Sequence, residues 1–226
     1  FHSSGGIPTP NIDYVKTATE NIAPHIKTGD ILILESTSPV GTTDLIKDML
    51  LEQGVDLDGV HIAYCPERVL PGLIMTELVQ NDRVIGGINE SSTIAVADFY
   101  RSFVKGGILQ TQAKTAEMCK LTENSFRDVN IAFANELSII CASNGVAVWE
   151  LINLANHHPR VNILQPGTGV GGHCIAVDPW FIVSQEPKDA KIIQTARRVN
   201  DSKPVWVINK VKIAITEFLK INPEKT

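Results

Sequence analysis

The chain has 226 residues, of which 43% are hydrophobic and 20% charged, a composition typical of folded globular proteins and not of disordered ones. It has no run of about 18 consecutive apolar residues, so no membrane-spanning helix is predicted. The net charge of −5 gives no reason to expect a nucleic-acid or membrane-surface partner. At roughly 100–200 residues per domain, the length predicts one large domain or two small ones.

The first half alternates strand and helix patterns. The segment from Asn11 to about residue 26 has helical spacing, and Ile31 to Leu34 is a short apolar run typical of a strand buried on both faces. The elements that follow are a helix at 42–51, strands at 60–65 and 83–87, a helix at 92–104 and a strand at 108–109. This alternation predicts an α/β fold with a parallel, helix-covered sheet, and we assign it to a first domain spanning residues 1–110.

The second half is predicted to be mainly helical and forms a second domain, residues 111–226. A long helix is expected at 115–143, ending at Asn144-Gly145, and a shorter one at 148–155. Two more helices are expected from about Lys188 and from about Lys203, after a glycine-rich segment at 165–178.

The four cysteines are Cys65, Cys119, Cys141 and Cys174, and their wide spacing does not resemble a disulfide framework. No secretory signal peptide is recognised, so we expect a reducing, cytoplasmic setting. The chain begins with Phe1 and ends in a polar run, from which we expect either processing or a piece of a longer protein.

The glycine-rich segment gives the strongest indication of chemistry. Cys174 follows four glycines, and Asp178 lies four positions later. If Cys174 opens a helical turn, exposed N–H groups and the helix dipole stabilise its thiolate, as a covalent nucleophile requires. A tight loop with a buried, inert cysteine explains the pattern equally well. A dinucleotide-binding fingerprint is rejected, because no strand leads directly into the glycines.

Three other groups of residues are candidates. Lys120, Asn124 and Asp128 share one helix face, which is either solvated or aimed at a developing oxyanion. Thr37 and Glu67 follow two predicted strands and could line one crevice, or belong to an ordinary turn and a surface ion pair.

The histidine pair His157-His158 lacks zinc-site spacing, so no metal site is predicted there. Arg160, two residues further on, is a candidate partner for a phosphate or carboxylate.

Five motifs together resemble the nucleotide-sugar 6-dehydrogenases, the family of UDP-glucose and GDP-mannose dehydrogenases. They are ESTSPVGTT from Glu35, YCPERVLPG from Tyr64, NDRVIGG from Asn81, KLTENSFRDVNIAFANEL from Lys120 and GVGGHCIAVDPWF from Gly169. Their order covers nearly the whole chain. The variants CPERVLPG and GGHCIAVDPWF are most similar to the branch that oxidises UDP-N-acetyl-D-mannosamine.

The resemblance implies a four-electron oxidation of a sugar's primary alcohol to a carboxylate, with two NAD molecules and one water. Cys174 would form the thiohemiacetal and then the thioester, and Lys120 with Asn124 would stabilise the oxyanion. Glu67, Thr37 and Asp178 would organise water and proton transfers. Ser36, Thr37, Glu67 and Cys174 would face the cofactor. The implied substrate contacts are Glu67, Arg68, Val69, Leu70, Arg160, Asn162, Gly167, Gly169, Gly171 and Gly172.

The resemblance also sets limits. Family members begin with a G-x-G-x-x-G half-domain and end with a further α/β domain, and neither is present in these 226 residues. The resemblance therefore implies that residues 1–110 are the second half of a Rossmann-type, NAD-binding parallel sheet and that residues 111–226 are the helical middle domain used for dimerisation. We therefore expect the isolated chain to be inactive, and a homodimer to form through the helix at 115–143. UDP-GlcNAc, UDP-glucose and GDP-mannose remain alternative substrates. A catalytically silent dimerisation module and a thiol-redox protein are alternative functions.

Overall fold

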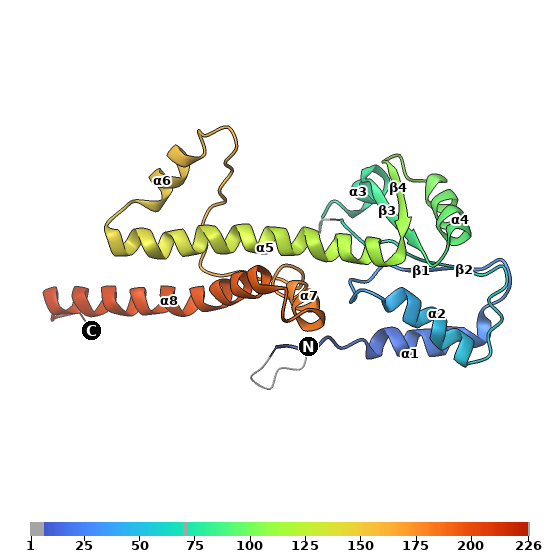
Figure 1. Cartoon of the computed structure of the whole chain (residues 1–226). Coiled ribbons are helices and arrows are strands. Elements are labelled where there is room, and N and C mark those ends of the chain that lie inside the picture. The colour runs from blue at the N-terminus through green and yellow to red at the C-terminus, as the bar shows by residue number, and fades with distance from the viewer. Residues whose placement is uncertain (1–6, 70–71, 226) are drawn as a thin grey trace. The chain divides into compact units, whose positions relative to one another are not determined.

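The computed structural model describes residues 7–69 and 72–225, which divide into two compact units on either side of the Glu123–Asn124 bond (Figure 1). We call residues 1–123 the N-terminal unit and residues 124–226 the C-terminal unit, and each is described by itself. Leu70, one of the predicted substrate contacts, lies outside the described residues.

A four-stranded sheet forms the centre of the N-terminal unit. Its strands are β1 (Ile31–Leu34), β2 (His61–Tyr64), β3 (Arg83–Gly87) and β4 (Ile108–Gln112), in the order β1-β2-β3-β4. The pairs β1–β2 and β3–β4 are parallel, as predicted, but β2 and β3 are antiparallel. The chain between β2 and β3 does not cross over the sheet, so β3 starts at the end where β2 finishes. The sheet is therefore mixed.

Helices cover both faces of this sheet. The helices of this unit are α1 (Asp13–Ile22), the 3-10 helix η1 (Ala23–His25), α2 (Thr42–Glu52), α3 (Ile74–Gln80) and α4 (Glu90–Arg101), and α1, η1, α2 and α4 contribute to the cores on the sheet. On one face Ala63 and Ile85 pack against Val96 of α4. On the other face Ile62 packs with Leu50 of α2 and with side chains of α1. Alternate residues of the strands therefore enter two separate cores, as the two-residue period of a strand requires.

One strand differs from its expectation. β2 and β3 are almost wholly buried, but every residue of β1 is at least partly exposed, and Ile31 is 39% exposed. The prediction that β1 is buried on both faces was wrong. An apolar run indicates burial, but in the described structure β1 is at the end of the strand order and pairs with β2 alone.

The C-terminal unit is helical. Helix α5 (Ala113–Asn144) begins in the N-terminal unit and continues into this one, followed by α6 (Val148–Ala155), α7 (Pro179–Gln185) and α8 (Lys191–Ile221). Gly145 adopts φ 67°, the left-handed conformation that ends a helix. The two predicted helices at 115–143 and 148–155 are confirmed.

The helices differ from the prediction in two respects. A break near Lys203 was expected, but α8 continues through Pro204 for 31 residues. Proline removes one i→i−4 hydrogen bond, yet the residues on both sides of Pro204 are helical. The short helices α3 and α7 were not predicted, because each spans only 7 residues and offers little periodicity to detect.

Candidate functional site

Glu67 follows the end of β2, and neighbouring groups hold its carboxylate. Oε1 accepts hydrogen bonds from the backbone N–H groups of Arg68 at 2.5 Å and Val69 at 2.7 Å. Oε2 lies 3.6 Å from Nη1 of the buried Arg83, and the Glu67 side chain remains 38% exposed. The carboxylate is therefore fixed in direction and still open to solvent, as a group that positions water must be.

Lys120 lies beside this loop. Its Nζ donates to the carbonyl oxygen of Glu67 at 2.8 Å. The backbone N–H of Glu67 donates in turn to the carbonyl oxygen of Glu35 at 3.3 Å, so the loops after β1 and β2 are adjacent. Two of the predicted catalytic residues therefore come together. An ammonium has three donors, and the bond to Glu67 uses one of them.

The predicted cofactor contacts Ser36 and Thr37 lie in the loop after β1. Ser36 is exposed and its carbonyl oxygen accepts from the Ser38 hydroxyl at 3.0 Å, while Thr37 is half-buried. The carboxyl end of a parallel strand is where open α/β sheets bind their ligands. Hydroxyl groups at this position fit the ribose and amide groups of a nicotinamide cofactor.

Glu117 anchors the same loop, and sequence analysis missed it. Its carboxylate is fully buried and accepts hydrogen bonds from Gly41 N at 2.6 Å, Thr43 N at 2.8 Å and the Thr43 hydroxyl at 2.7 Å. These donors lie at the N-terminus of α2, where a negative charge is stabilising. Glu117 therefore ties α2 to α5, one turn before Lys120.

Arg68, one of the predicted substrate contacts, is held by two residues of α5. Its guanidinium forms an ion pair with Glu123 of α5 and lies 3.6 Å from the sulfur of Cys119. Burial is the main reason that the pKa of the Cys119 thiol is raised. These contacts hold the loop after β2 to α5, and they give Arg68 a structural partner within the chain.

A polar cluster lies between the sheet and α4. The Tyr100 hydroxyl donates to Glu35 Oε1 at 2.6 Å, and the Arg83 guanidinium lies 5.5 Å from the centre of the Tyr100 ring. Burial, followed by the hydrogen bond to Glu35, raises the pKa of Tyr100 far above its ordinary value. Burial likewise raises the pKa of Cys65. Cys65 therefore stays a neutral thiol, unlike a reactive cysteine.

Cys174 has a different environment. Its thiol is exposed, and its carbonyl oxygen accepts from Val177 N at 3.0 Å and Asp178 N at 2.8 Å, so Cys174 opens a single helical turn before α7. This matches the expected geometry and excludes the alternative of a buried cysteine. Gly172, two residues earlier, has φ +88°, a conformation that a residue with a Cβ rarely adopts.

Asn124 and Asp178 are paired. Asn124 Nδ2 donates to Asp178 Oδ2 at 2.5 Å, and both side chains are buried. One turn further along α5, Asp128 is fully buried against Arg197 of α8. Burial raises the pKa of Asp128, although Arg197 and Asn200 oppose this effect. A solvated helix face is therefore excluded for Asn124 and Asp128.

Several other predicted contacts are exposed. Arg160 and Asn162 follow α6 and point to solvent, as do His157 and His158. Within the described part of the chain, no three His, Cys, Asp or Glu side chains are grouped so that they could hold a metal ion. A Cβ added at Gly171 would meet no atom within 4 Å. The fold itself therefore does not require glycine at that position.

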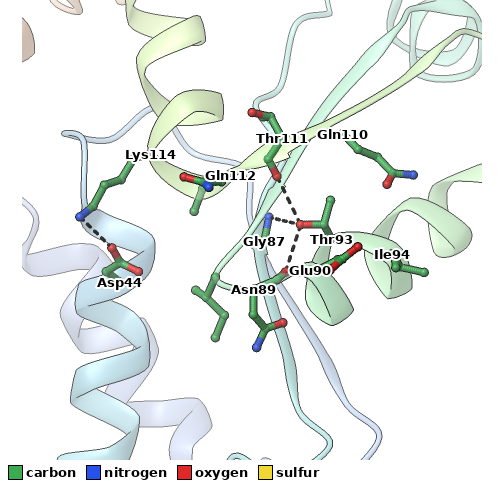
Figure 2. Close-up of a pocket in the computed structure, with 12 residues that line it drawn as sticks. Asp44, Gly87, Asn89, Glu90, Thr93, Ile94, Gln110, Thr111, Gln112 and Lys114 are labelled. Atoms are coloured by element: carbon green, nitrogen blue, oxygen red, sulfur yellow. Dashed lines mark hydrogen bonds and ion pairs between the residues drawn. The ribbon is translucent and has the colours of Figure 1, made fainter.

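A pocket of about 490 Å³ lies at the ends of β3 and β4 (Figure 2). Among the residues that line it, the Thr93 hydroxyl accepts from Gly87 N at 3.0 Å and donates to Asn89 O at 3.1 Å. Lys114 forms an ion pair with Asp44, also in the lining. Gly87 is in register with Ala63, so the pocket lies toward the start of β2 and Glu67 follows its end. The pocket contains none of the predicted site residues.

The sequence matches two models of one family. Residues 2–104 match the "UDP-glucose/GDP-mannose dehydrogenase family, NAD binding domain", and residues 114–202 match the central domain of the same family. The chain belongs to the UDP-glucose/GDP-mannose dehydrogenase family.

No helix in the described residues is long and apolar enough to cross a membrane.

Similar proteins are known from sequence and from structure. The chain is 59% identical to UDP-N-acetyl-D-mannosamine dehydrogenase of Escherichia coli, over 93% of this chain and 52% of that protein. It is 57% identical to an NDP-N-acetyl-D-galactosaminuronic acid dehydrogenase of Ralstonia nicotianae, over 92% of this chain and 52% of that protein. The structure of a UDP-D-ManNAc dehydrogenase of Pyrococcus horikoshii matches with a TM-score of 0.87 and 44% identity, covering 92% of this chain and 50% of that one. The chain thus spans about half the length of these relatives.

Proposed function

We propose that the complete protein is an NAD-dependent nucleotide-sugar dehydrogenase that oxidises a primary alcohol to a carboxylate. The observation that carries the proposal is the pairing along α5. Lys120 and Asn124 are one helical turn apart, and each contacts another residue of the predicted set, Glu67 and Asp178 respectively. A solvated helix or a silent module does not require these two pairs.

The residues divide the chemistry as follows. NAD, when bound, accepts one hydride in each of the two oxidations. Ser36 and Thr37, at the carboxyl end of β1, are placed to hold it. The Cys174 thiolate attacks the aldehyde carbon, and a C–S bond forms while the carbonyl oxygen becomes an oxyanion. The Lys120 ammonium and the Asn124 amide stabilise that negative charge.

The second oxidation leaves a thioester, which must be hydrolysed. The proposal assigns Glu67 to position and deprotonate the attacking water, since its carboxylate is fixed and partly exposed. Water adds to the thioester carbon, the C–S bond breaks, and the carboxylate leaves while Cys174 regains a proton. Asp178, hydrogen-bonded to Asn124, holds that amide in place. The aldehyde stays bound throughout, because it is captured before it can dissociate.

The substrate proposed is UDP-N-acetyl-D-mannosamine. The 59% identity to the E. coli enzyme supports it. The glycines of the cysteine segment, residues 167–175, would allow the nucleotide sugar to approach the backbone, and the open space at Gly171 supports this contact. The relative from R. nicotianae, 57% identical, makes a 2-acetamido sugar of another configuration the first alternative.

The domains and assembly follow the same proposal. Residues 1–110 would form part of the NAD-binding domain, and residues 111–226 would carry the nucleophile. A homodimer through α5 is proposed because Phe126 and Phe133, seven residues apart, are 68% and 53% exposed. A cytoplasmic location suits a nucleophilic thiol, which must stay reduced. Sedimentation at micromolar concentration should give a dimer, and a monomer would contradict this assembly.

The test measures how many NADH molecules form for each uronic acid produced. The complete protein is incubated with NAD and with UDP-N-acetyl-D-mannosamine, UDP-GlcNAc, UDP-glucose or GDP-mannose in parallel. The expected result is two NADH for each uronic acid formed, fastest with the first sugar. One NADH per sugar, with an aldehyde product, would overturn the four-electron proposal. Equal rates with all four sugars would overturn the substrate assignment alone.

A further inference from the structure

Four polar side chains are fully buried between α5 and α8, in the C-terminal unit. Asp128 and Asn135 belong to α5, and Arg197 and Asn200 belong to α8. Burying charges and amides costs free energy unless they are hydrogen-bonded, and apolar residues of similar size often make an equally stable interface. Stability alone is therefore a weak explanation for this group.

The four side chains form one connected network. Asn200 Nδ2 donates to Asp128 Oδ1 at 2.7 Å and to the Asp128 carbonyl oxygen at 3.0 Å. Asn135 Nδ2 donates to Asn200 Oδ1 at 2.8 Å, and Arg197 Nη1 donates to Asp128. Each member is fixed by another, so displacing one of them disturbs the rest.

Arg197 also donates to Asp201 of α8 through Nε and Nη2. Two further hydrogen bonds run from this network to the cysteine segment. Asn135 Oδ1 accepts from the backbone N–H of Gly167 at 2.8 Å, at the start of the segment. Arg197 Nη1 donates to the carbonyl oxygen of Ile175 at 3.2 Å, at its end. Ile175 directly follows the proposed nucleophile. The segment between these anchors forms neither helix nor strand, so its ends are held by side chains rather than by secondary structure.

We propose that Asn135 and Arg197 are positioning residues that fix both ends of the cysteine segment and thereby hold the Cys174 sulfur where it attacks the substrate. The inference rests on the proposed function for its catalytic consequence. Its structural part concerns the order of the segment and can be tested separately. Positioning within about 1 Å matters because misplacement by that distance can cost a hundredfold in rate.

Two variants and one control test the proposal in the complete protein. Arg197→Lys keeps a positive charge, but the shorter side chain does not reach the position of Nη1, which donates to both Asp128 and Ile175. Asn135→Ala removes the acceptor for Gly167. Ser138→Ala is the control, because its hydroxyl accepts from Lys203 of α8, donates only to the backbone carbonyl of Asn135, and makes no hydrogen bond to the segment. The control removes an α5–α8 hydrogen bond of the same kind.

The measurements are kcat, KM for NAD, and hydrogen exchange of backbone amides in residues 167–175. Both variants should lower kcat on the order of 10–100-fold, leave KM for NAD within about twofold, and speed exchange across the segment. Ser138→Ala should change none of these by more than about twofold. Folded variants with unchanged kcat and unchanged exchange would overturn the proposal.

Other failures remain distinguishable. If the parent protein oxidises no nucleotide sugar, the proposed function fails, and faster exchange in the variants alone still supports the anchoring. If both variants fail to fold, the rate of amide hydrogen exchange in the parent protein tests the anchoring instead. Slow exchange of the Gly167 amide, hydrogen-bonded to Asn135, supports the proposal, and exchange at the rate of an unstructured peptide overturns it.

Discussion

Replacing Glu117 tests how the loop after β1 is held to α5. In Glu117→Ala the buried Thr43 N–H loses its acceptor, which costs about 1–3 kcal/mol, and α2 loses the negative charge at its N-terminus, worth about 0.3–2 kcal/mol. Gly41 is only partly buried, so water can replace its lost partner. The Thr43 hydroxyl can rotate toward another acceptor. We expect the free energy of unfolding to fall by about 2–4 kcal/mol.

The assay is urea denaturation of the complete protein. The free energies of unfolding are compared between proteins for which this free energy falls with urea concentration at the same slope. Glu117→Gln should lose less, because its amide oxygen still accepts from one backbone N–H. The control is Lys114→Ala, which removes another contact between α5 and α2, the exposed ion pair with Asp44 at 3.3 Å. Surface pairs of this kind contribute about 0–1 kcal/mol. Equal losses in Glu117→Ala and Lys114→Ala would refute the reasoning.

Three further predictions concern single residues. The pKa of Tyr100 is raised in the folded state, so the unfolded chain loses its phenol proton at a lower pH than the folded chain. The free energy of unfolding should therefore fall as pH rises above about 10. Unfolding curves measured at alkaline pH should show a smaller fall in Tyr100→Phe. Gly86→Ala would place a Cβ 2.4 Å from the Gln112 carbonyl oxygen, so calorimetry should show a loss of about 2–3 kcal/mol. Gly171→Ala should keep its melting temperature and raise KM for the nucleotide sugar several-fold; an unchanged KM would exclude close contact there.

The sequence predicted the elements whose apolar residues form a clear local pattern. The strands of the sheet are short apolar runs, and α5 keeps a helical rhythm without Gly or Pro until Asn144. Glu67 and Thr37 could be placed together because both follow strands that end at one edge of the sheet. Cys174 stood out because four glycines precede it. Local patterns were sufficient for these features, since each depends on neighbours in the sequence.

The rest depends on partners that are distant in sequence. Glu117 binds residues 74 and 76 positions away, and Arg197 meets Asp128 across 69 positions. A charged residue on a helix ordinarily indicates a solvated face, so neither could be identified as buried. Pro204 ordinarily marks a helix end, but α8 continues through it. The antiparallel pairing of β2 with β3 depends on the route of the intervening loop, which composition does not specify.

The most direct test of the account is the replacement of its nucleophile. Cys174→Ser in the complete protein, with Cys141→Ala as the control in the same half of the chain, is incubated with NAD and UDP-N-acetyl-D-mannosamine. The uronic acid is then measured by mass spectrometry. The account predicts that acid formation falls by more than about 10³-fold in Cys174→Ser and stays near the parent rate in the control. Acid formation at the parent rate in Cys174→Ser would contradict a covalent cysteine mechanism.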